Sequence, residues 1–156
     1  DVLIDELLDG KPIVCLDGIK DPGNLGTIIR TADWFGVKNI ILSENAVDSY
    51  NDKVVRSTMG SIFRVRILES EGLARTLSEL KKKGYEIVGL TMDGIRLRRQ
   101  GASERQGKIV YVFGSESHGV RPELEKLLDK KYTIKGSGSA ESLNVAVACG
   151  ILLHSL

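Results

Sequence analysis

The chain has 156 residues, of which 42% are hydrophobic and 28% are charged, and its formal net charge is +1. This length suits one domain with a buried core and is too short for two ordinary domains. The sequence contains no apolar run that could cross a membrane and opens with no signal peptide, so we expect a cytoplasmic protein that binds no membrane. The near-neutral charge does not by itself indicate nucleic-acid binding, which usually shows as a basic excess.

The cysteines and histidines argue against disulfide or metal chemistry. Cys15 and Cys149 stand among apolar residues, as small buried side chains do. His118 and His154 have no partner at the spacing of zinc ligands. We therefore expect no disulfide and no bound metal.

Short β-branched runs alternate with helical patterns along the chain. In chain order, the patterns predict a strand at 12–16, a helix at 24–35, a strand at 39–42, a helix at 52–59, a strand at 63–68, a helix at 70–83, strands at 86–90 and 108–113, a helix at 122–128, a strand at 132–134 and a helix at 142–154. In the first of these helices apolar residues recur three and four positions apart, and Gly36 marks its end.

The alternation predicts an α/β fold with a mostly parallel sheet and helices on both faces, because strands that are apolar throughout must be covered on both sides. The strand at 108–113 is nearly all apolar, so we expect it at the centre of the sheet. Sheets of this kind bind ligands at the carboxyl ends of their strands. The loops to consider are therefore 17–24, 91–107, 114–119 and 135–142.

The loop at 17–24 joins a strand to a helix, and Asn24 stands where an N-cap belongs. A turn followed by a cap explains most of this loop. It does not explain Arg30 in the first turns of a largely apolar helix, where the helix dipole slightly disfavours a cation. Arg30 is therefore either a surface charge or a group that binds an anion such as phosphate.

The loop at 114–119 follows the most apolar strand. Its residues do not fit the dinucleotide-binding fingerprint, the P-loop or the nucleophile elbow, and the missing fingerprint excludes an ordinary Rossmann dehydrogenase. Glu116, Ser117 and His118 are neighbours in sequence, which argues against a catalytic triad because adjacent side chains rarely face each other. What remains is a tight glycine turn that presents Glu116 and backbone groups.

The loop at 135–142 reads as a flexible link to a helix capped by Ser142. Asn144 lies in the first turn of this apolar helix, where its side chain gains little from packing, and this favours a role facing a ligand.

An arginine-rich segment at 94–108 either contacts phosphate or is a solvated loop. Its basic residues are Arg96, Arg98, Arg99, Arg105 and Lys108.

Three stretches stand at the strand–helix junctions: 17–32, DGIKDPGNLGTIIRTA; 113–119, FGSESHG; and 141–148, ESLNVAVA. In this order and at these separations, they resemble the SpoU (TrmH-like) family of RNA ribose methyltransferases within the SPOUT superfamily. The resemblance covers nearly the whole chain, from about Pro12 to the end. One departure is Lys135, where many members have a proline that would stiffen the turn.

The resemblance implies the SPOUT methyltransferase fold, whose C-terminal part is threaded into a deep trefoil knot, although protein chains are in general unknotted. It also implies S-adenosyl-L-methionine as the cofactor. The positions that match the family's cofactor site are Thr91, Gly114, Ile134, Leu143 and Asn144. The positions that match its catalytic site are Asn24, Arg30, Glu116, Ser142 and Asn144.

The implied activity is transfer of a methyl group to a ribose 2′-hydroxyl of RNA. Arg30 matches the family's proposed base, but arginine stays protonated in proteins. We therefore expect Arg30 to position the ribose and a neighbouring phosphate and to stabilise the developing alkoxide. Asn24 would fix Arg30 and the substrate, and Glu116 would hold Arg30 or RNA in place.

The family usually works as a homodimer, with the closing helix at the interface and the site completed across it. We expect 23S-type ribosomal RNA as the substrate, because a preceding RNA-binding domain is common among members with that target. The alternatives are tRNA or a non-catalytic RNA-binding module of the same fold. Residues 1–11 look like the remnant of a link to a preceding segment, and 12–156 would form the catalytic domain.

Overall fold

The computed structural model describes residues 4–98 and 107–155. Helices and strands alternate along them, as expected. In chain order they are α1 (Ile4–Leu7), β1 (Ile13–Leu16), α2 (Pro22–Trp34), β2 (Asn39–Ser43), α3 (Asp52–Ser57), the 3₁₀ helix η1 (Ser61–Phe63), β3 (Arg66–Ser70), α4 (Leu73–Lys82), β4 (Glu86–Arg96), β5 (Ile109–Phe113), α5 (Pro122–Glu125), β6 (Lys130–Thr133) and α6 (Val145–Ser155).

The strands form one six-stranded sheet in the order β3-β2-β1-β5-β4-β6, and every neighbouring pair is parallel. This confirms the predicted α/β fold class. β1 and β5 lie at the centre, and nearly all of their residues are buried. A central parallel strand is covered on both faces, which explains why these two segments are apolar throughout.

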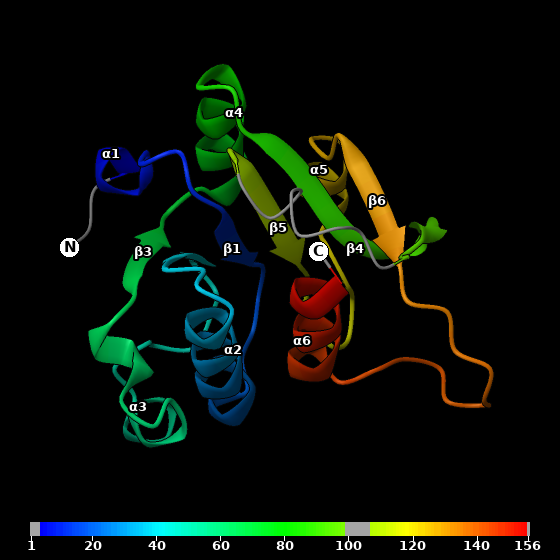
Figure 1. Cartoon of the computed structure of the whole chain (residues 1–156), viewed down its shortest axis with the longest axis horizontal. Coiled ribbons are helices and arrows are strands. Elements are labelled where there is room, and N and C mark those ends of the chain that lie inside the picture. The colour runs from blue at the N-terminus through cyan, green and yellow to red at the C-terminus, as the bar shows by residue number, and fades with distance from the viewer. Residues whose placement is uncertain (1–3, 99–106, 156) are drawn as a thin grey trace.

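Helices cover both faces of the sheet, and each face has its own apolar core. α2 and α6 pack with Val14, Leu16 and Phe113 on one face. α1, α4 and α5 pack with Ile13, Cys15 and other inward-facing strand residues on the opposite face. α2 and α6 lie side by side, and α3 packs against the outer side of α2 (Figure 1).

Several predicted strand boundaries were wrong, two of them by more than two residues. β3 begins at Arg66, because the preceding residues 61–63 form a 3₁₀ turn. β4 does not end at residue 90 but continues to Arg96, into the segment predicted as a loop, because β6 pairs with this extension across a β-bulge. Gly94 makes the bulge possible, since a Cβ there would lie 2.4 Å from the Tyr132 backbone. Arg99 and Arg105 of the arginine-rich segment lie outside the described residues.

The N-terminal segment is part of the packed domain. The side chain of Leu7 in α1 is fully buried in the core that α4 and α5 share. The proposed boundary between residues 11 and 12 stays a prediction. Within residues 4–98 and 107–155, no helix combines the length and apolar character needed to cross a membrane.

Candidate active site

The loops expected to carry chemistry gather at one edge of the sheet. β1, β5, β4 and β6 are parallel neighbours, so their carboxyl ends meet there. Leu16 at the end of β1 pairs with Phe113 at the end of β5, so the loops at 17–24 and 114–119 begin side by side. The loop at 134–144 runs from the end of β6 to the start of α6 (Figure 1).

The start of α2 leaves the side chain of Asn24 available. Asp21 is the N-cap, and its carboxylate accepts a hydrogen bond of 2.8 Å from the Asn24 backbone N–H. Pro22 occupies the first turn, where no backbone donor is needed. The prediction that Asn24 caps the helix was therefore wrong. Because Asp21 performs the capping, the Asn24 amide can form contacts elsewhere.

The start of α6 is capped by Asn144 and not by Ser142, so this prediction was also wrong. The Asn144 Oδ1 atom accepts hydrogen bonds from the backbone N–H groups of Ala146 at 2.9 Å and Val147 at 3.3 Å. The helix begins at Val145, which places Asn144 at the capping position and Ser142 in the exposed loop before it.

Two hydrogen bonds between side chains join all three loops. Asn144 Nδ2 donates to Asn24 Oδ1 at 2.9 Å, and Asn24 Nδ2 donates to Glu116 Oε1 at 2.5 Å. The directions follow from the cap: Asn144 uses its oxygen on the helix, so only its NH₂ group can face Asn24. Asn24 then accepts with its oxygen and turns its own NH₂ group to Glu116, whose carboxyl oxygen accepts the hydrogen bond. We call this set of three residues the amide chain.

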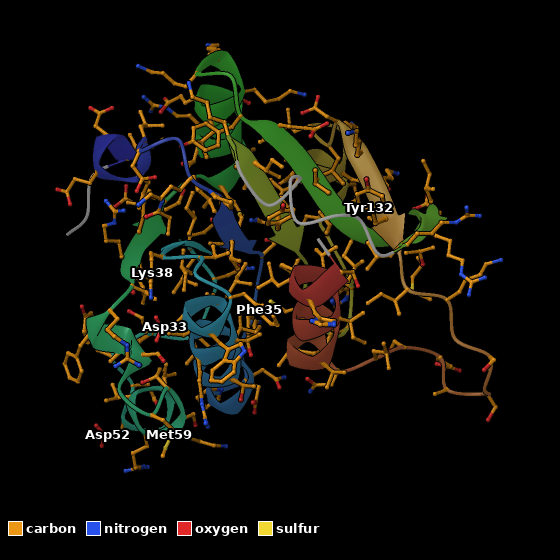
Figure 2. All side chains as sticks on the ribbon, in the orientation of Figure 1. Asp33, Phe35, Lys38, Asp52, Met59 and Tyr132 are labelled. Atoms are coloured by element: carbon orange, nitrogen blue, oxygen red, sulfur yellow. The ribbon has the colours of Figure 1, made fainter. Side chains whose placement is uncertain are left out.

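The packing of α2 against α6 holds two members of the amide chain together. The two helices run in the same direction, because Asn24 contacts Asn144 near their first turns and the rings of Phe35 and His154 lie 6.1 Å apart at their far ends. Phe35 lies between the two helices (Figure 2). Both helix N-termini therefore point at the same edge of the sheet, where their dipoles favour negative charge.

The loop at 114–119 is closed on itself and presents Glu116 at its tip. Backbone hydrogen bonds link Ser115 and Gly119 in both directions, at 3.1 and 2.9 Å. Only glycine fits at position 114, because a Cβ there would lie 1.9 Å from the Gly119 carbonyl carbon. His118 and Ser117 hydrogen-bond each other on the exposed side, at 2.7 Å. The rejected catalytic triad has no support here, since Glu116 bonds to Asn24 instead.

Arg30 and Ser142 are exposed and have no partner within the part of the chain described. Arg30 lies six residues after Asn24 on α2, about 9 Å further along the helix axis, and neither Asn24 nor Glu116 bonds to it. The Asn24 amide is already occupied by Asn144 and Glu116, so it does not fix Arg30 within one chain. The guanidinium of Arg30 is free to meet a group from outside.

The residues that match the family's cofactor positions lie at the same edge. Thr91 stands in β4, Gly114 directly follows β5, and Ile134 directly follows β6. These three strands are neighbours in the sheet. Leu143 lies next to Asn144 and is 48% exposed, which is unusual for a leucine beside a packed helix.

Sequence reasoning missed a buried ion pair below these loops. Asp17, the residue after β1, is 1% exposed and forms an ion pair of 2.7 Å with Arg121, which follows the loop at 114–119. The sequence places the two residues more than a hundred positions apart. An aspartate followed by glycine normally indicates a turn, so this pair gave no sign that Asp17 is buried. The only such sign was the apolar strand that directly precedes Asp17.

The cysteine thiols are inert in this environment. Both Cys15 and Cys149 are free and buried, and burial raises the pKa of Cys149 to about 12 and that of Cys15 further still. Among residues 4–98 and 107–155, no three His, Cys, Asp or Glu side chains are grouped to bind a metal ion. The absence of a metal in the working protein stays a prediction.

The sheet and its joined loops place the chain in a class of α/β proteins that includes solved RNA methyltransferases. It superposes on the AdoMet-bound rRNA methyltransferase from Sinorhizobium meliloti with a TM-score of 0.81 and 35% identity, over 94% of this chain and 55% of that one. It superposes on the A. aeolicus TrmH/SpoU tRNA modifying enzyme with a TM-score of 0.80 and 31% identity, over 97% of this chain and 78% of that one.

Sequence comparison is more specific. Residues 11–154 match the SpoU rRNA Methylase family. Over 153 residues the chain is 35% identical to the 23S rRNA (guanosine(2553)-2'-O)-methyltransferase RlmP of Bacillus subtilis (strain 168), covering 97% of this chain and 60% of that protein. The chain belongs to the SpoU rRNA methylase family, and it spans about three fifths of the length of that relative.

Proposed function

We propose that the chain transfers a methyl group from S-adenosyl-L-methionine to a ribose 2′-hydroxyl of RNA, with 23S-type ribosomal RNA as the substrate. The observation that carries the proposal is the amide chain, because it joins the three motif loops at the carboxyl edge of the sheet. The relative from Bacillus subtilis, named as a 23S rRNA 2'-O-methyltransferase, supports both the reaction and the substrate.

The residues at this edge fit the cofactor. Leu143 beside them is 48% exposed, and an exposed apolar side chain suits the face of an adenine ring. Thr91, Gly114, Ile134, Leu143 and Asn144 would hold it. When bound, the cofactor supplies a methyl group that its sulfonium charge already activates. An AdoMet-bound structure of a family relative supports this assignment.

The protein would then mainly orient the two reactants and handle one proton. Arg30 would bind the ribose and its phosphate and stabilise the charge that develops on the 2′-oxygen. Glu116, at the end of the amide chain, would accept a hydrogen bond from RNA with its second oxygen. Asn24, Asn144 and Ser142 would line the site and keep its loops together.

We further propose that the protein is a homodimer and that Arg30 serves the partner's site. Exposed apolar side chains lie on α2, on α6 and in the loop directly before α6: Trp34 is 84%, Val147 52% and Leu143 48% exposed. Burial of such residues against a second copy is favourable. A free guanidinium on α2 would then meet the cofactor loops of the other protomer. Sedimentation of wild type and Val147→Glu, expected as dimer and monomer, tests this arrangement.

Two finer assignments follow from the family. We propose that the segment from β5 to α6 is threaded as a trefoil knot and that the protein acts in the cytoplasm, where ribosomal RNA is assembled. α6 leaves the edge strand β6 and packs on α2 near the centre, as threading requires. A crystal structure traced through residues 91–145 would test the knot.

A tRNA substrate is the second candidate, favoured by the A. aeolicus tRNA modifying enzyme, of which this chain covers 78%. The decisive experiment incubates the chain with tritiated S-adenosyl-L-methionine and either unmodified large-subunit ribosomal RNA or total tRNA. A ribose methyl leaves a dinucleotide that resists alkaline hydrolysis. We expect this product from ribosomal RNA; label in tRNA alone would favour the second candidate. No label, with no thermal shift by S-adenosyl-L-methionine or its demethylated product, would leave a non-catalytic module.

A further inference from the structure

The first motif loop starts from a buried carboxylate. Asp17 is 1% exposed and directly follows β1. A carboxylate buried this deeply destabilises the folded state unless it is paired and hydrogen-bonded. One residue satisfies both of its oxygens: Arg121 donates from Nε to Oδ1 at 2.7 Å and from its backbone N–H to Oδ2 at 3.0 Å. Asp17 and Arg121 therefore fix each other in both position and direction.

The same guanidinium reaches a third loop. Arg121 Nη1 donates to Glu44 Oε1 at 2.9 Å, and Glu44 directly follows the end of β2. This hydrogen bond holds the pKa of Glu44 below its usual value. Arg121 thus ties together the chain segments that follow β1, β2 and β5. Lysine cannot replace it, because a single ammonium lacks the planar fork that reaches two carboxylates at fixed angles.

A rigid loop connects Arg121 to the catalytic edge. Phe113 and Val120, on either side of the loop at 114–119, are both buried in the cores. Between them the loop closes on itself through the paired backbone groups of Ser115 and Gly119. Because this loop has little freedom, the placement of its base by Arg121 determines where Glu116 stands at its tip.

The two motif loops are therefore joined twice, at their base by Asp17 and Arg121 and at their mouth by Asn24 and Glu116. The contact at the mouth is exposed, and water competes with such a hydrogen bond, which contributes little by itself. We propose that Arg121 is a positioning residue for methyl transfer: through Asp17 it sets the separation of the two loops, so that Glu116 meets Asn24. This inference rests on the proposed function only in its kinetic test, which measures methyl transfer.

The test compares Arg121→Lys with Arg75→Ala, a more severe substitution of an arginine whose only ion pair among the described residues is the exposed one with Glu79. Both variants should fold, as circular dichroism will show. In the assay with tritiated S-adenosyl-L-methionine and large-subunit ribosomal RNA, we expect Arg121→Lys to lower kcat about tenfold. Arg75→Ala should keep the wild-type value.

Combination with Glu116→Ala, which removes the acceptor for Asn24, separates positioning from stabilisation of the fold. If Arg121 acts through Glu116, Arg121→Lys should change kcat less than about twofold in the Glu116→Ala background. The proposal would be overturned if Arg121→Lys lowered kcat equally in both backgrounds, or did not lower kcat in the otherwise wild-type protein. If wild type transfers no methyl group, the proposed function fails instead. Hydrogen exchange then decides: backbone amides at 18–24 and 114–119 should exchange faster in Arg121→Lys than in Arg75→Ala, and equal rates would overturn the proposal.

Discussion

The two ends of the parallel sheet use polar residues in opposite ways. At the amino ends, polar groups hold the N-terminal segment against the strands. Arg66 donates to the Glu6 carbonyl oxygen at 2.7 Å and pairs with Asp9, and the Tyr85 hydroxyl donates to the Leu7 carbonyl oxygen at 3.3 Å. Each of these polar groups therefore has a hydrogen-bond or ion-pair partner within the fold.

At the carboxyl ends, polar groups are joined to one another but leave capacity for a ligand. The amide chain occupies one oxygen of Glu116, and the second oxygen has no partner in the described ranges. Arg30 and Ser142 are exposed and unpaired within the same ranges. The difference indicates that changes at the amino ends should affect stability, whereas changes at the carboxyl ends should affect the reaction.

The largest effect is expected at Arg30. Arg30→Ala should lower methyl transfer about a hundredfold or more, because it removes the group that stabilises the developing charge. Its affinity for S-adenosyl-L-methionine, measured by calorimetry, should stay unchanged, and so should its thermal midpoint. Lys82→Ala, an exposed cation on α4, is the control and should keep full activity. Wild-type turnover in Arg30→Ala would refute the assigned role.

The two functions of Asn144 can be separated by two substitutions. Asn144→Ala should lose the cap, at a cost of about 1 kcal/mol in the free energy of unfolding, and also about tenfold in methyl transfer. Asn144→Asp keeps a capping oxygen but cannot donate to Asn24. It should therefore keep wild-type stability and lose the same activity. Normal turnover in Asn144→Asp would show that the donated hydrogen bond is not needed.

At the amino ends, Asn39→Ala should lower stability and leave the reaction unchanged. Asn39 is fully buried, and its Nδ2 atom donates to Asp9 Oδ1 at 3.0 Å and to the Leu7 carbonyl oxygen at 3.4 Å. Its loss should lower the free energy of unfolding in urea by about 1–2 kcal/mol. The rate of methyl transfer per folded molecule should not change. A loss of rate without a loss of stability would break the division between the two ends.

The smallest effect concerns acid stability. A hydrogen bond from Lys38, supported by Arg64, lowers the pKa of Asp33 from 3.8 to about 2. Figure 2 labels Asp33 and Lys38 near the end of α2. Because the folded state favours the ionised carboxylate, Asp33 contributes fully to the free energy of unfolding above its pKa in the unfolded chain. This contribution is lost as the pH falls through its pKa in the folded protein.

The advantage of wild type over Asp33→Asn should therefore narrow between about pH 4 and about pH 2. Thermal midpoints of the two proteins across that range measure it. A difference in thermal midpoint that stays constant with pH would mean that the ionisation of Asp33 does not contribute to stability.

Local patterns were enough to predict the order of the strands and of the helices between them, except α1 and η1. They also predicted the central place of the strand at 108–113, because buried parallel strands are apolar throughout. They failed where a distant partner decides the outcome. β4 extends to Arg96 only because β6 pairs with it, and no local pattern announces that pairing. The caps failed for a related reason: Asp21 and Asn144 compete with equally good cappers three and two residues away, and the folded backbone selects between them.

The roles of the site residues were suggested by the motifs, but their contacts were not. The sequence placed Asn24, Glu116 and Asn144 in three loops that converge at one edge. That these residues bond to one another, and that Arg30 stays free, depends on the packing of α2 against α6. The pairing of Asp17 with Arg121 depends equally on the neighbouring β1 and β5 strands.

The most direct test of the account is a titration of the ¹⁵N-labelled chain with S-adenosyl-L-methionine, followed by NMR. Binding at the carboxyl edge should shift the backbone amides at 114–119 and 134–144. The amides of Leu7, Arg66 and Tyr85 at the amino ends should stay in place. Shifts confined to the amino ends, or no shifts at a saturating concentration, would contradict the claim that the cofactor binds at the carboxyl edge of the sheet.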